Sequence, residues 1–246
     1  MADNTYQYEM AWGTDIGRIR SRNEDALKTF PEQGLAILSD GMGGHRAGDV
    51  ASQMAVDIIA ENLIDSNNSI TPEQLVASLE AANQSIRQKA YDEPNCQGMG
   101  ATVVVASFVD EHLLIAHVGD SRLYRFFDGQ LEQLTEDHTL AQQYVREGLM
   151  NQNEADRWVG RNMLVKGLGI DSHVNPDISQ DDLQPESMYL LCSDGLTDAL
   201  SDDVIAATLR KHGESMQNAV DRLIKLANDY GGPDNISVIL ARQIEA

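Results

Sequence analysis

Four aspartates stand where short apolar runs end or begin, and such an arrangement can hold a cation. They are Asp40, Asp120, Asp194 and Asp234. The first three each follow an apolar run that predicts a strand, whereas Asp234 precedes such a run. If that last strand runs antiparallel to the others, all four carboxylates fall at one edge of the sheets. Gathered carboxylates repel one another unless a hard cation lies among them, and oxygen-only ligand sets favour Mg²⁺ or Mn²⁺ over zinc.

An aspartate at a strand end also has an ordinary explanation, because Asp-Gly is a common turn sequence. This explanation is strong for Asp120, since a new strand is predicted to start at once with Arg122. It is weaker for Asp40 and Asp194, because no partner strand follows either of them. The glycine-rich segment 41–44 lacks the Gly-Lys-Ser/Thr of a P-loop, so we expect its glycines to let the backbone approach a metal and offer a carbonyl oxygen.

A basic cluster precedes the first of these aspartates. Residues 15–25 contain three arginines, Arg18, Arg20 and Arg22, beside three acids. Exposed ion pairs are the ordinary explanation for such a segment, and each stabilises a fold by about 0.5 kcal/mol. The alternative is an arginine fork for a phosphoryl group next to an acidic metal site. The segment by itself leaves both interpretations open.

The composition limits the partners that the chain can have. Its 246 residues carry 18 Lys and Arg against 39 Asp and Glu, a formal net charge of −21, so neither nucleic acid nor an anionic membrane is expected as a partner. Cys96 and Cys192 are too few for a disulfide framework and fit a reducing compartment. The first residues show no signal peptide, and no stretch approaches the ~18 apolar residues of a membrane span, so a cytoplasmic protein is expected.

The elements that must position the aspartates follow from the hydrophobic pattern. Runs rich in β-formers predict strands at residues 34–39, 101–109, 112–118, 122–127, 187–192 and 236–241. Helical spacing predicts long amphipathic helices near residues 50–59, 75–86 and 219–230, and a polar helical stretch at about 138–158. Hairpin signals at Asp110-Glu111 and Asp128-Gly129 predict that the strands between 101 and 127 form an antiparallel meander.

This order of elements predicts the α+β class, with helices that cover antiparallel sheets. No linker, repeat or low-complexity tract divides residues 1–246, so a single domain is expected. Residues 147–162, called the flap below, are polar and weakly patterned and predict a mobile insertion. His138 is expected to begin a helix that Asp137 caps, and His117 to lie in a strand without metal-ligand spacing.

Six segments resemble, in order, the PPM or type 2C metal-dependent Ser/Thr protein phosphatases, especially the compact bacterial members. They are Arg20-Ser21-Arg22-Asn23-Glu24-Asp25, Ser39-Asp40-Gly41-Met42-Gly43-Gly44-His45, Gly100-Ala101-Thr102, Val118-Gly119-Asp120-Ser121-Arg122, Cys192-Ser193-Asp194-Gly195-Leu196 and Gly232-Pro233-Asp234-Asn235. These segments span nearly the whole chain, so a chance match of all six is negligible.

The resemblance implies a four-layer α-β-β-α sandwich of two antiparallel sheets flanked by helices, with a dinuclear metal site at one end. Two tightly bound Mn²⁺ or Mg²⁺ ions are implied, of which Asp40 bridges both and the Gly41 carbonyl completes the first. Asp194 and Asp234 are implied to hold the second ion. Asp120, together with Asp194, matches the position of a weaker third ion in bacterial members.

The resemblance also assigns roles in the reaction. Glu24 is implied to act through water, and Arg20 to bind the substrate phosphate, whereas Arg18 and Arg22 do not align with that position. His45 corresponds to the proposed general-acid histidine, which sits closer to the Asp-Gly pair in other branches. The implied reaction is hydrolysis of phosphoserine and phosphothreonine by direct attack of a metal-bridging water or hydroxide. The implied partners are phosphorylated proteins, namely Ser/Thr kinases and their substrates, and a monomer is expected.

Two departures from the bacterial pattern bear on substrate choice. Residues 165–169 read Val-Lys-Gly-Leu-Gly where relatives commonly carry Thr-Arg-Ala-Leu-Gly, and residues 157–160 lack a frequent His-Pro pair. A pseudophosphatase is the alternative from another class, and the presence of every metal aspartate disfavours it. Activity on small phosphomonoesters or phosphotyrosine stays open, although no arginine follows Cys192 as in the Cys-x5-Arg loop of tyrosine phosphatases.

Overall fold

The computed structural model describes residues 7–43, 47–64, 69–109 and 111–244. Over these residues the strands form two antiparallel sheets. The first sheet has the order β1 (Gln7–Asp15), β11 (Ile236–Ile244), β10 (Met188–Cys192), β7 (Arg122–Phe127) and β8 (Gln130–Gln133). The second has the order β2 (Asp25–Phe30), β3 (Leu35–Met42), β5 (Val103–Val109), β6 (His112–Val118) and β9 (Asp177–Asp182), and β4 (Gly100–Ala101) pairs with the end of β3.

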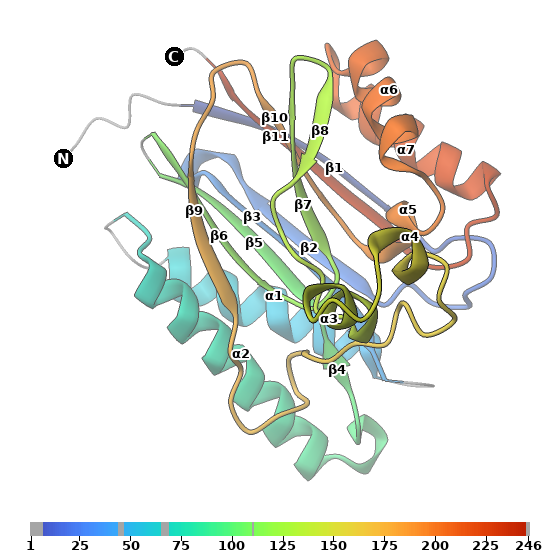
Figure 1. Cartoon of the computed structure of the whole chain (residues 1–246). Coiled ribbons are helices and arrows are strands. Elements are labelled where there is room, and N and C mark those ends of the chain that lie inside the picture. Colours follow the sequence, from blue (N-terminus) through green and yellow to red (C-terminus); the bar gives the residue numbers. More distant parts are fainter. Residues whose placement is uncertain (1–6, 44–46, 65–68, 110, 245–246) are drawn as a thin grey trace.

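Helices cover the outer face of each sheet (Figure 1). The second sheet is covered by α1 (Gly48–Ile64) and α2 (Pro72–Asp92), and the first by α6 (Asp202–His212) and α7 (Met216–Asp229). Short helices complete the chain: α3 (Leu140–Arg146), α4 (Gln152–Ala155), α5 (Asp194–Thr197) and two 3₁₀ turns at Pro31–Gln33 and Pro94–Cys96. Within the described ranges, no helix has the length and apolar character needed to cross a membrane.

The core has three apolar layers, because the central strands are buried on both faces. In β3, Leu35 and Ile37 pack with α1 and α2, whereas Ala36 and Leu38 pack between the two sheets. The alternation of side chains along a strand therefore fills both layers with one continuous apolar run. Packing of α6 and α7 on the first sheet forms the third layer. The α+β class and the four-layer sandwich are thus confirmed.

The six predicted strands are all found, although the one at 101–109 is interrupted at Thr102 and divided between β4 and β5, and four further strands are not in the prediction. They are β1, β2, β8 and β9, and each lies at the edge of its sheet. An edge strand is exposed along one side and needs no continuous apolar run, as the sequence Asp-Ile-Ser-Gln-Asp-Asp of β9 illustrates. Hydrophobic pattern alone therefore finds the interior strands and misses the edges.

Two other predictions need correction. The expected meander is wrong between β6 and β7, because the chain leaves the second sheet after Val118 and enters the first at Arg122. Only β5 with β6 and β7 with β8 form antiparallel neighbours there. The predicted cap at Asp137 is also wrong, since the helix begins at Leu140 and the Thr139 side chain accepts the capping bond. Asp137 is instead held by Arg122.

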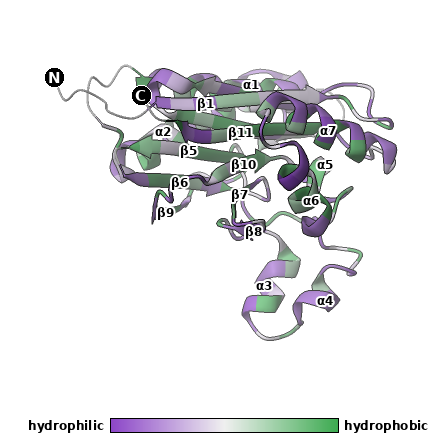
Figure 2. Cartoon of the chain, turned by 90° about the horizontal axis from the view of Figure 1, so that it is seen from above, coloured by the Kyte–Doolittle hydropathy of each residue, from purple (hydrophilic) through white to green (hydrophobic). Residues whose placement is uncertain are grey.

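The predicted polar helix at 138–158 is divided into α3 and α4. Figure 2 shows both helices projecting from the body of the sandwich, with the flap between and beyond them. Tyr144 and Trp158 lie with ring centroids 5.6 Å apart, which joins the two ends of this projection. The rest of the chain places the ends of β3, β6 and β10 and the start of β11 at one end of the sandwich, where the predicted site must form.

Candidate metal centre

A cavity of about 500 Å³ opens at this end of the two sheets. It is lined by seven of the eight residues that the sequence assigns to the site: Arg20, Glu24, Asp40, Gly41, Asp120, Asp194 and Asp234. The eighth, His45, lies outside the described residues. The other lining residues are Met42, Gly43, Thr102, Asn162 and Leu164. Residues from both sheets, the Arg20 loop and the segment after α4 therefore converge on one cavity.

Thr102 joins the two loops that carry Asp40 and Asp120. Its backbone N–H donates to the Asp40 carbonyl oxygen at 2.8 Å, and its Oγ1 accepts from the Asp40 N–H at 3.0 Å. The same Oγ1 lies 2.7 Å from the Ser121 hydroxyl, next to Asp120. Thr102 lies in one of the six matching segments but is not among the residues that the sequence assigns to the site. Its contacts show that it fixes the spacing of two candidate ligands.

Asn235 holds in place the loop that carries Arg20 and Glu24. Its Nδ2 donates to the carbonyl oxygens of Ile16 and Arg22 at 2.9 and 2.8 Å. Its Oδ1 accepts from the Glu24 N–H at 2.8 Å. Because Asn235 follows Asp234 directly, the aspartate and the loop with the arginine are held in one unit.

Close backbone contact explains the glycine after Asp40. The Gly41 N–H donates to the Glu24 carbonyl oxygen at 3.1 Å. A Cβ atom built on Gly41 would lie 2.0 Å from the Gly48 carbonyl oxygen at the start of α1. Since atoms cannot approach so closely, a side chain at position 41 would separate the end of β3 from α1 and displace the neighbouring carboxylate.

The three arginines of the basic cluster take different positions. Arg20 Nη2 lies 2.6 Å from Asp234 Oδ2 at the rim of the cavity. Arg22 is exposed and reaches only to within 3.7 Å of Asp49, away from the lining. The Arg18 backbone N–H donates to the Gly232 carbonyl oxygen. The structure therefore places one arginine of the three at the site, and it is the one singled out by the resemblance.

Burial and mutual repulsion dominate the electrostatics of the carboxylates. Burial raises the pKa of Asp120 to about 7 and that of Asp25, a further acid beside the cavity, to about 6. Burial and neighbouring carboxylates hold the pKa values of Asp40 and Asp194 well above their usual range. Among the described residues, the buried Asp194 Oδ1 has no hydrogen-bond partner. Such a group of oxygen atoms suits a hard divalent cation, which would replace protons.

Asp25 is an acid that the sequence did not assign to the site. It pairs in register with Asp40 across β2 and β3, and its Oδ2 accepts from the Ser193 hydroxyl at 2.8 Å. Ser193 precedes Asp194, so this contact links the ends of β2 and β10. The alternating pattern of β2 could not reveal it, because its importance comes from a partner 168 residues away.

The flap reaches the cavity through its last residue, Asn162. The Asn162 Nδ2 donates to Asp198 at 2.7 Å, and Arg161 lies 3.3 Å from the same carboxylate. Asp198 caps the C-terminal end of α5, the helix that begins with Asp194. A second cavity of about 590 Å³ lies behind these contacts, and Asn162 lines both cavities. The end of the flap is thereby tied to the helix that carries a candidate ligand.

Comparison with known proteins bears on this arrangement. The sequence pattern of the family described as protein phosphatase 2C matches residues 13–240. The chain belongs to the protein phosphatase 2C family. The match includes every segment that lines the cavity, so the site lies within the region that defines the family.

Relatives in this family cover almost the whole chain. The serine/threonine phosphatase stp of Listeria welshimeri is 38% identical over an alignment of 237 positions that covers 94% of this chain and 94% of the relative. The crystal structure of the Mycobacterium tuberculosis serine/threonine phosphatase PstP/Ppp superposes with a TM-score of 0.88 at 36% identity, covering 96% of this chain and 98% of that one. A PstP catalytic domain in complex with two manganese ions gives a TM-score of 0.87 at 35% identity, covering 98% and 100%.

The raised pKa values predict how stability depends on pH when metal is removed. The folded chain keeps a proton on Asp120 that the unfolded chain releases near pH 4, so this contribution to stability is complete below about pH 4 and is lost as the pH rises through about 7. His117 and His138 act in the opposite sense, because burial lowers the pKa of each, but only below about pH 6.5. In EDTA, the melting temperature should therefore fall by about 2 °C between pH 6.5 and 8.5, as measured by calorimetry.

Two variants test whether the buried carboxylates cause this fall of the melting temperature with pH. Asp120→Asn keeps the shape of the side chain but cannot lose a proton, so its melting temperature should fall less over the same interval. Asp221→Asn, at an exposed position on α7, should keep the wild-type slope. Mn²⁺ should raise the melting temperature more at pH 8.5 than at pH 6.5. Equal slopes in all three proteins would show that the buried carboxylates do not control the effect.

Proposed function

We propose that this chain is a metal-dependent protein serine/threonine phosphatase, acting on phosphorylated proteins as a single catalytic domain. The observation that carries the proposal is the convergence of four aspartates and Arg20 on one cavity, in a chain of the protein phosphatase 2C family. Relatives over nearly the full length are named serine/threonine phosphatases. A related catalytic domain binds two manganese ions, which matches the oxygen-only donors here.

The donors fit two divalent ions and a weaker third. We assign Asp40 and the Gly41 carbonyl to the first ion, and Asp40, Asp194 and Asp234 to the second. Asp120 and Asp194 would hold the third. The fit rests on the unpartnered Asp194 Oδ1 and on the raised pKa values of the buried acids. When bound, Mn²⁺ or Mg²⁺ would supply the positive charge that activates water and offsets charge on the phosphoryl group.

The residues of this chain supply binding and orientation. Arg20 extends from the Asn235-held loop to the rim of the cavity, where its guanidinium can donate further hydrogen bonds to phosphate oxygens while it contacts Asp234. Glu24 lines the cavity behind it, where its carboxylate can orient water. The Arg20 side chain is about half exposed at the rim, so a phosphorylated side chain of a protein can reach the cavity from solvent.

We further infer the setting in which the enzyme works. Phosphorylated Ser/Thr kinases and their substrates are the proposed partners, because a protein phosphatase must oppose the kinases that make its substrates. The proposed state is a cytoplasmic monomer. Size-exclusion chromatography with light scattering tests the monomer, and fractionation of cells that express the tagged chain tests the location.

Removal of metal should abolish activity. After exhaustive dialysis against EDTA, hydrolysis of a phosphothreonine peptide should cease, and Mn²⁺ should restore it. Asp194→Asn should lower the rate at least a hundredfold and weaken Mn²⁺ binding in calorimetric titrations, because it removes a charged ligand. Asp203→Asn, at an exposed position on α6, serves as the control and should behave as wild type. Undiminished turnover in EDTA would contradict the proposed function.

Arg20 should contribute to binding of the substrate phosphate, whereas Arg22 should not. Charge-assisted bonds to phosphate stabilise a complex by roughly 2 kcal/mol, whereas an exposed ion pair contributes less than about 1 kcal/mol. Arg20→Ala should therefore lower kcat/KM at least tenfold, while Arg22→Ala should change it less than threefold. Mn²⁺ affinity should stay the same or rise in Arg20→Ala, because Asp234 loses a competing cation. Equal losses in both variants would mean that the basic cluster acts only through its overall field.

A further inference from the structure

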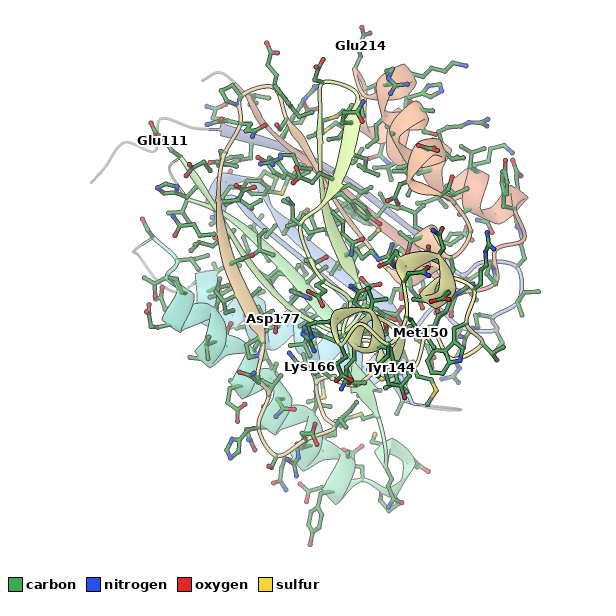
Figure 3. The ribbon with its side chains drawn as sticks, in the orientation of Figure 1. Glu111, Tyr144, Met150, Lys166, Asp177 and Glu214 are labelled. Carbon is green, nitrogen blue, oxygen red and sulfur yellow. The ribbon has the colours of Figure 1, made fainter. Side chains whose placement is uncertain are left out.

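Four side chains gather beside the metal centre without belonging to its lining. His117 lies on β6 opposite Asp177, the first residue of β9. His138 precedes α3, and its ring stacks on that of His117 with centroids 4.6 Å apart. Lys166 follows the flap and lies beside Asp177 (Figure 3). Over the described part of the chain, His117, His138 and Asp177 offer ligand atoms within 4.8 Å of one another, a spacing that is close enough to hold a metal ion.

The hydrogen bonds argue against a metal there. The Gly119 backbone N–H donates to His138 Nδ1 at 3.1 Å, and a backbone amide can only donate. The neutral ring must therefore carry its proton on Nε2, which lies 3.2 Å from Asp177 Oδ1. Lys166 Nζ lies 2.8 Å from the same oxygen and 3.3 Å from His138 Nε2. An ammonium can only donate, so with the proton on Nε2 the lysine bonds to Asp177 and not to the ring. The cation beside Asp177 is thus Lys166, and the ring nitrogen that would face a metal holds a proton.

His138 holds Gly119 from both sides. Its backbone N–H donates to the Gly119 carbonyl oxygen at 3.0 Å, while its ring accepts from the Gly119 N–H. Gly119 has a φ of +105°, and a Cβ atom there would lie 2.6 Å from the Thr102 side chain. The peptide before Asp120 is therefore fixed by His138 and by Thr102, and its conformation directs the Asp120 carboxylate into the cavity.

The same histidine also receives the chain as it leaves the flap. The Val165 N–H donates to the His138 carbonyl oxygen at 2.9 Å, and Thr139 and Leu164 form an isolated β-bridge. Lys166 then reaches Asp177, so the two contacts fasten the exit of the flap to β9. One residue thereby joins the flap to the loop of a candidate metal ligand.

We propose that His138 is a positioning residue for the weaker third metal ion, acting through Gly119 on Asp120. Asp177, which Lys166 holds in place, keeps the ring in the state that accepts from the Gly119 N–H. This inference rests on the proposed function, because it takes Asp120 as a metal ligand. His138 lies outside the cavity and would not contact a metal ion, yet its replacement should weaken metal binding.

The test compares two replacements of His138. His138→Leu removes the acceptor, and the Mn²⁺ concentration for half-maximal activity should rise about tenfold, as should the Kd of the weak ion in calorimetric titrations. His138→Asn keeps an acceptor oxygen near the place of Nδ1, so both quantities should stay within about threefold of wild type. Asp177→Ala frees the ring to change tautomer and should give an intermediate shift. Wild-type Mn²⁺ dependence in His138→Leu would overturn the proposal.

Two further measurements separate positioning from a loss of fold. His117→Phe keeps the ring stack but loses the bond from Nε2 to the Glu136 carbonyl oxygen, so it should lower the melting temperature in EDTA and leave Mn²⁺ dependence unchanged. In an Asp120→Asn background, His138→Leu should cause no additional shift in Mn²⁺ dependence. An equal shift in both backgrounds, or equal losses in the Leu and Asn variants, would show that His138 acts on the fold and not through Asp120.

The failure of this inference can be told apart from failure of the proposed function. If wild-type protein needs no Mn²⁺, the proposed function fails, and the inference with it. If Asp120→Asn binds Mn²⁺ as wild type does, the assignment of Asp120 fails and overturns the inference, while the phosphatase itself stands. If Asp120→Asn weakens the third ion and His138→Leu does not, only the positioning role is lost.

Discussion

At one end of the sandwich, Asp40, Asp120 and Asp194 bury carboxylates within reach of one another's charge. Removal from water and mutual repulsion both disfavour ionisation, so the folded chain must either keep protons on these groups or admit cations among them. Much of the surrounding structure holds these mutually repelling carboxylates in place. Without rigid support the carboxylates would separate, and the site would lose its affinity for divalent ions.

The support comes from polar side chains that connect segments distant in sequence. Thr102 links the strand end that carries Asp40 to the crossing that carries Asp120. Asn235 holds the loop of Arg20 and Glu24 against the start of β11. Each of these residues satisfies backbone groups that would otherwise be buried without partners, so the same bonds serve stability and the geometry of the site.

The crossing of the chain between the sheets has a consequence for function. A hairpin after β6 would have left Asp120 in an ordinary turn at the edge of one sheet. Because the chain instead passes from β6 to β7, Asp120 lies between the sheets, beside the candidate ligands from both. The flap is attached nearby, through Asn162 to Asp198 and through the segment that follows it to His138. The flap and the candidate metal ligands therefore share their anchors.

The sequence by itself determined the class of fold, the interior strands and the four aspartates of the candidate site. Interior strands are buried on both faces and must be apolar throughout, and an aspartate follows or precedes each of four such strands, so a local pattern was enough. Arg20, Glu24 and Gly41 were predicted from the resemblance of their segments to a known family. The four edge strands, the crossing before Arg122 and the cap at Thr139 were decided only by the tertiary structure. So were the roles of Asp25, His138 and Lys166, because their partners lie far away in the sequence and their hydrogen bonds exist only when the two sheets and the flap are packed together.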